Sequence, residues 1–134
     1  MSIDIVTAAW APRVLSVLRI ASGLLFLQHG TSKFLGIPET GFSPAVTSLP
    51  GIAGVFELVG GILLVLGLFT RPVAFLLSGV MAFAYFIVHA PQGFYPILNG
   101  GELAALYCFT FLYLAFAGGG AWSLDARMRA SSAI

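Results

Sequence analysis

The chain has 134 residues, of which 59% are hydrophobic and only 8% are charged. Soluble domains are about 45–50% apolar and about 25% charged, so this composition excludes a water-soluble fold, and it also excludes a disordered chain. The net charge of +1 gives no basic surface for nucleic acid, and a single cysteine allows no internal disulfide. We therefore expect an all-α protein that crosses a membrane several times.

Four apolar segments are long enough for membrane-spanning helices, each of which needs about 20 residues. They cover residues 12–35, 51–69, 72–90 and 101–118. Pro12 and Pro72 suit the first turn of a helix, and glycines at 118–120 end the last segment. Prolines and glycines mark the stretches between the spans, 36–51 and 91–100, as loops. The prediction is one domain, residues 1–134, folded as an antiparallel four-helix transmembrane bundle.

The basic residues gather at one end of this predicted bundle. Arg13 precedes the first span, Arg71 lies between the second and third spans, and Arg127 and Arg129 follow the fourth. The opposite end has only Lys33. The positive-inside rule then places both termini in the cytoplasm and the two longer loops outside.

Small and polar residues share one face of each of the first three predicted spans. Residues three and four positions apart lie on the same face of a helix, and small residues let helices approach closely in lipid. Glu57 is therefore expected to be hidden from the acyl chains. The faces are Ser16, Arg19, Ser22, Gly23, Phe26, His29, Gly30 and Lys33; Gly54, Glu57 and Gly61, with Gly60 beside them; and Ser78, Ala82, Tyr85 and His89.

Ionisable side chains inside the spans are candidates for function, because each costs at least a few kcal/mol in apolar surroundings. Five of the six fall in the outer half of the predicted bundle, and Arg19 lies deeper. We expect four of the five, His29, Glu57, His89 and Glu102, to share one water-accessible pocket, since sharing water and hydrogen bonds lowers the cost of burial. The six are Arg19, His29, Lys33, Glu57, His89 and Glu102.

A structural role competes with a functional one at three of these positions. Arg19 is placed to pair with Glu57 in a buried ion pair, which would neutralise both. Lys33 suits an interfacial lysine whose amine reaches water. Glu102 suits the start of a helix, where the macrodipole favours a negative charge.

Metal and haem sites are both disfavoured by the residue pattern. A haem held between His29 and His89 is chemically reasonable, but it usually needs a roomier bundle. Glu57 and Glu102 do not belong to the Glu-x-x-His spacing of carboxylate-bridged metal sites, so no metal is expected.

The sequence resembles the DoxX family of small four-helix membrane proteins. The combination of HG-x-x-K, E-x-x-GG, H-x-x-x-GF, NGGE and SLD carries the resemblance, in the family's order along nearly the whole chain. These motifs lie in LRIASGLLFLQHGTSKFLG at 18–36, ELVGGILLVLGLFTRP at 57–72, VHAPQGFYPILNGGELAALY at 88–107 and GGGAWSLDA at 118–126.

The resemblance implies a redox-associated subunit of the bacterial inner membrane, because the family takes its name from a subunit of a thiosulfate:quinone oxidoreductase. The implied ligand is a quinone, or a small thiol or sulfur compound, reached from the outer side. The implied partners are the lipid bilayer, a redox enzyme and further copies of the chain. The alternative is a non-catalytic binding or transport protein, or a membrane anchor for a partner enzyme. The candidate catalytic residues are His29, Glu57, His89 and Glu102, and the candidate substrate-binding residues are Lys33, Arg19, Asn99 and Tyr85.

Overall fold

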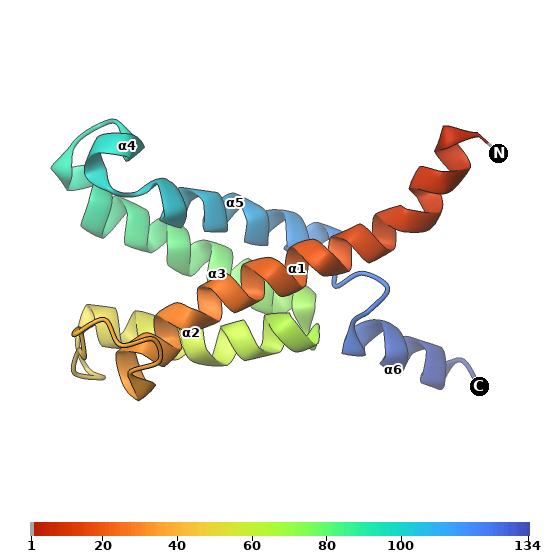
Figure 1. Cartoon of the computed structure of the whole chain (residues 1–134), viewed down its shortest axis with the longest axis horizontal. Coiled ribbons are helices and arrows are strands. Elements are labelled where there is room, and N and C mark those ends of the chain that lie inside the picture. The colour runs from red at the N-terminus through yellow and green to blue at the C-terminus, as the bar shows by residue number, and fades with distance from the viewer. Residues whose placement is uncertain (1) are drawn as a thin grey trace.

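The computed structural model describes residues 2–134, and none of these residues lies in a β-strand. Helix α3 continues into a π-helical turn, η1, and a 3-10 turn, η2 (Figure 1). The elements in chain order are α1 Ile3–Leu35, α2 Leu49–Leu66, α3 Thr70–Ala84, η1 Tyr85–His89, η2 Ala90–Gln92, α4 Pro96–Asn99, α5 Glu102–Ala117 and α6 Leu124–Ser132. The predicted all-α fold is confirmed.

Three helical segments are long and apolar enough to cross a membrane: Ile3–Leu35, Leu49–Leu66 and Thr70–Gln92. Helix α5 is apolar too, but it has only 16 residues. At a rise of about 1.5 Å per residue it covers about 24 Å, less than the hydrocarbon core of about 30 Å. The chain is a helical membrane protein, and its fourth apolar helix is shorter than a full span.

The helices pack mainly as two antiparallel pairs, α1 with α2 and α3 with α5. The pairs lie apart at the end that holds α4, where α1 ends and α2 begins (Figure 1). We call this end, with residues 36–48 and 93–101, the loop end. The opposite end, with the α2–α3 turn, residues 118–123 and α6, is the tail end.

Glycines allow the main chains of α1 and α2 to touch. A Cβ atom at Gly30 would lie 2.5 Å from the amide nitrogen of Leu58, and one at Gly61 would lie 2.8 Å from the Cα of Leu27. Neither distance leaves room for a side chain. The small-residue faces predicted for these helices are confirmed, since six of the predicted positions on α1 are buried: Ser16, Arg19, Ser22, Gly23, Phe26 and Gly30.

Aromatic rings join the two pairs in the core. Phe26 of α1 meets Tyr107 and Phe111 of α5 edge to face, with ring centroids 5.3 and 5.0 Å apart. Leu64 of α2 and Leu77 of α3 are buried in the same cluster. Such edge-to-face contacts fix ring orientation as well as bury surface.

Three helices begin earlier than the sequence predicts: α1 at Ile3, α2 at Leu49 and α3 at Thr70. Helix α1 begins at Ile3, so Pro12 lies inside it and not in its first turn. Pro12 cannot donate the usual bond to the carbonyl of Ala8, which is tolerated because Ala8 lies on an exposed stretch. Helix α2 begins at Leu49, because the Ser48 side chain caps it by accepting the N–H of Gly51.

The substitution Gly30→Ala is expected to destabilise the α1–α2 pair, because its methyl group would overlap the main chain of Leu58. Overpacking of this kind should lower the melting temperature of the detergent-purified protein by about 5 °C or more. The matched control is Gly79→Ala on α3, where a Cβ atom meets nothing within 4 Å. The control should melt within about 2 °C of the parent. Equal melting of the two variants would contradict the close contact.

Candidate functional site

Lys33 and Glu57 form the one ion pair found among residues 2–134. Lys33 Nζ donates to both carboxylate oxygens of Glu57, at 2.9 and 2.7 Å, and the side chains are 14% and 9% exposed. Gly54, one turn before Glu57, leaves room for the lysine stem, since a Cβ there would lie 3.0 Å from Lys33 Cδ. Glu57 is thus buried, as its helical face predicts.

The predicted pairing of Arg19 with Glu57 is wrong, and so is the reading of Lys33 as a lysine that only reaches for water. Arg19 lies beside Leu64, about two helical turns from Glu57 along α2. In an antiparallel pair the residues nearest the connecting loop face each other. Lys33, in the last turn of α1, therefore meets Glu57, and Arg19 cannot reach it.

Arg19 instead binds main-chain carbonyl groups and is fully buried. Its guanidinium donates to Leu64 and Val65 at the end of α2, and to Gly119 and Trp122 after α5, at 2.6 to 2.8 Å. The last carbonyls of a helix have no partner within the helix, and a guanidinium offers five donors to satisfy them. Arg19 therefore fastens residues 118–122 to the first helix pair.

Asp125 closes the same end of the bundle. Its carboxylate accepts the N–H groups of Phe69 and Thr70, at 2.8 and 2.9 Å, and so caps the start of α3. Phe69 has a φ of 52°, a conformation that bulky residues seldom adopt without such support. Burial opposes the charged form, but the hydrogen bonds from Thr70 and Phe69 and the nearby Arg129 outweigh it and hold the pKa of Asp125 below its usual value.

A second group of candidates meets around Asn99 at the loop end. The Asn99 carbonyl lies 3.1 Å from His89 Nδ1, and its side-chain amide donates to Tyr85 Oη at 3.3 Å and to the carbonyl of Gly93 at 2.9 Å. Gly101 donates its N–H to Asn99 Oδ1 at 2.8 Å. Tyr85 and His89 begin and end the π-helical turn, a feature often found at functional sites.

The two remaining candidates stand apart from both groups. The ring of His29 lies edge-on to that of Tyr107, with centroids 6.3 Å apart. Glu102 is the first residue of α5 and is exposed, which matches the helix-start reading of its carboxylate. Among residues 2–134, no three His, Cys, Asp or Glu side chains lie close enough to hold a metal ion.

A cavity of about 670 Å³ lies between α2 and α3, next to the ion pair. Lys33 and Glu57 are its only charged or polar lining side chains. His29, His89 and Glu102 do not line it, so this cavity is not one that all four candidates share. His89 instead lies beside the carbonyl of Asn99, and the ring of His29 lies against that of Tyr107 on α5. The apolar lining is Leu49, Pro50, Ile52, Ala53, Phe56, Phe75, Leu76, Gly79, Val80, Met81, Phe83, Ala84, Ile87 and Val88.

The substitution Arg19→Leu should destabilise the protein strongly, because it takes a donor from four carbonyls. The carbonyls of Leu64 and Gly119 keep a second donor, from Gly67 N–H and the Ser16 hydroxyl, whereas those of Val65 and Trp122 lose the side-chain donor that they have. Each unsatisfied group costs about 1–3 kcal/mol, so the melting temperature should fall by about 10 °C or more. The control is Arg13→Leu, which removes an exposed arginine from the same helix and should shift melting by about 2 °C at most. If both variants melt alike, the carbonyl contacts of Arg19 do not hold the tail end.

Comparison with known proteins places the chain among membrane proteins of one family. The DoxX family profile matches residues 14–90. An uncharacterized protein of Haemophilus influenzae is 52% identical over 87% of this chain and 91% of its own length. A Bacillus subtilis protein named "Putative oxidoreductase CatD" is 31% identical over 81% of this chain and 82% of its own.

An uncharacterized membrane protein of Mycobacterium tuberculosis is 30% identical over 90% of this chain and 84% of its own length. No solved structure matches the chain. The family profile covers more than half of the residues, and these relatives align along most of the chain. The chain therefore belongs to the DoxX family.

Proposed function

We propose that this protein is a redox-associated membrane subunit that binds a lipid-soluble quinone in the cavity between α2 and α3. The observation that carries the proposal is an apolar groove with a single buried ion pair, Lys33–Glu57, in its lining. Binding sites for small molecules commonly combine an apolar lining of about 300–1,000 Å³ with a few placed polar groups.

The groove suits a ligand that arrives from the membrane. Phe75, Leu76 and Phe83 of α3 line it and are largely exposed, so in a bilayer they face the acyl chains. An isoprenoid tail entering sideways from the lipid would lie along these residues. The tail would then remain in apolar surroundings while the head group approaches the ion pair.

The ion pair supplies the chemistry that a quinone head group needs. The Lys33 ammonium has three N–H donors. Two of them bind the carboxylate of Glu57, so the third is left for a quinone carbonyl. Reduction to the quinol takes two electrons and two protons, and Glu57 and Lys33 are placed to pass protons to the ring oxygens. The electrons come from a partner redox protein or an oxidisable sulfur compound, since the sequence holds no nucleotide-binding motif.

The name of the Bacillus subtilis relative supports a redox role at the level of the family. The competing function is a non-catalytic binding or transport protein, or an anchor for a partner enzyme. An anchor would need no ligand in the groove, so quinone binding separates it from the proposal.

We also infer that the loop end faces away from the cytoplasm of a bacterial inner membrane. Arg127 and Arg129 lie on α6 of the tail end, Arg71 lies in the first turn of α3 beside it, and Arg13 lies in the half of α1 that packs there. The positive-inside rule places such an end in the cytoplasm. In a Cys108→Ala background, a cysteine at Thr47 should react with an impermeant maleimide in intact cells. A cysteine at Ser131 should react only after the cells are opened. The reverse pattern would contradict the orientation.

The substitutions Glu57→Gln and Gly79→Leu should each weaken binding of a short-chain ubiquinone to the protein in nanodiscs by about tenfold or more. Glu57→Gln breaks the ion pair. Gly79→Leu fills the groove at a position where a side chain meets no other part of the protein. The measurement is a binding titration, with melting curves to show that each variant is folded.

The control for charge is Glu39→Gln, which removes an exposed carboxylate at the same end and should change the dissociation constant less than about twofold. Because Gly79→Leu leaves the ion pair untouched, it tests the groove even if Glu57→Gln fails to fold. Unchanged binding in a folded Gly79→Leu protein would rule out the groove as the quinone site.

A further inference from the structure

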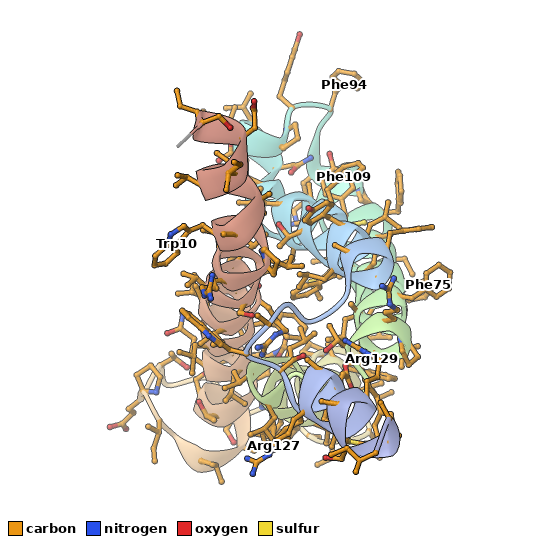
Figure 2. The ribbon with its side chains drawn as sticks, turned by 90° about the vertical axis from the view of Figure 1, so that its right-hand side faces the viewer. Trp10, Phe75, Phe94, Phe109, Arg127 and Arg129 are labelled. Carbon is orange, nitrogen blue, oxygen red and sulfur yellow. The ribbon has the colours of Figure 1, made fainter. Side chains whose placement is uncertain are left out.

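A second and larger cavity, of about 1050 Å³, lies at the tail end. It is bounded by the first half of α1, the start of α3, the end of α5 and one side of α6. Figure 2 looks at this side of the molecule and shows α6 below the end of α5. The cavity lies at the opposite end of the bundle from the Lys33–Glu57 pair. It shares no lining residue with the groove between α2 and α3.

The lining of this tail-end cavity changes from apolar to cationic. Leu15 of α1 and Tyr113 and Ala117 of α5 give it a mainly apolar wall on the side of the bundle. Arg71, in the first turn of α3, and Arg129 of α6 give it two guanidinium groups. These arginines stand where the helices reach the head-group region, so the cavity has the same polarity gradient as a phospholipid.

The charges around the cavity leave a positive excess. Asp125 is its one acidic lining residue, and both of its oxygens already accept hydrogen bonds from the start of α3. Arg71 Nη1 donates to the carbonyls of Phe116 and Ala115, which holds its guanidinium over the end of α5 with other N–H groups free. Arg129 donates no side-chain hydrogen bond within the described residues.

We propose that this cavity binds one anionic phospholipid, with the phosphate between Arg71 and Arg129 and an acyl chain against Leu15, Tyr113 and Ala117. Two cations and one engaged carboxylate balance the single negative charge of phosphatidylglycerol. The added positive charge of a choline head group would lie against the arginines and be disfavoured. The proposal is independent of quinone binding.

The test is a titration of the full-length, detergent-purified protein with phosphatidylglycerol, followed by thermal unfolding and native mass spectrometry. We expect one bound lipid and a rise in melting temperature of about 3 °C or more, since a ligand of the folded state stabilises it. Phosphatidylcholine and inorganic phosphate at the same concentration should give no such rise.

Arg129→Gln should weaken phosphatidylglycerol binding by about tenfold. The matched control is Arg127→Gln, which removes the same charge from the same helix. Figure 2 shows Arg127 and Arg129 on opposite sides of α6, and Arg127 does not line the cavity. The control should bind within about twofold of the parent.

Three results would overturn the proposal. Equal losses of phosphatidylglycerol affinity in Arg127→Gln and Arg129→Gln would show that the lipid is attracted only by the general positive charge of the surface. An equal response to phosphatidylcholine would show a cavity without charge selection, and an equal response to inorganic phosphate would show that the acyl chain plays no part. Arg129 is exposed and makes no structural hydrogen bond, so its variant should fold and give a decisive answer.

Discussion

The backbone contact between α1 and α2 sets the position of both buried cations. Gly30 and Gly61 let the two main chains meet, and the antiparallel register that follows places Arg19 beside the end of α2 and Lys33 beside Glu57. A buried charge in lipid is tolerated only with close partners. A small change in this register would remove the partners of both cations at once.

The two cations serve the two ends of the bundle in different ways. Arg19 gives its donors to four carbonyls and is fully buried, so together with Asp125 it holds the elements of the tail end together. Lys33 keeps one donor beyond its bonds to Glu57 and lies at the edge of an apolar groove. The structure therefore has one end that is fixed by hydrogen bonds and one end where the helix pairs separate beside an ion pair.

Helical periodicity was enough to predict which faces are buried, because the cost of exposing polar groups to lipid acts on every turn. It correctly indicated the inner face of α1 from Ser16 to Gly30 and the burial of Glu57. It did not indicate the partners of Arg19, because they are main-chain carbonyls, which every residue has and which no sequence pattern singles out. The sequence did contain a signal for the partner of Glu57. The loop between α1 and α2 joins the end of α1 to the start of α2, so Lys33 lies closer to Glu57 than Arg19 does.

Other contacts of the site could not be predicted from local sequence patterns. Asp125 caps α3 from 55 residues away, and only the folded chain brings the S-L-D segment to Thr70. The π-helical turn from Tyr85 to His89 changes the phase of α3 near its end. The depth of a residue along its helix does not fix which neighbour it faces, so similar depth did not bring His29, His89 and Glu102 to the cavity beside Glu57.

The most direct measurement is photo-crosslinking of the protein in nanodiscs with a quinone that carries a photoreactive tail, followed by peptide mapping. We expect the label on residues 49–57 of α2, 75–84 of α3 and 85–88 of η1. The labelling should fall with excess unlabelled quinone and be lost in Gly79→Leu. Label spread evenly over the lipid-facing helices, or concentrated near His29 and α5, would contradict a quinone site between α2 and α3.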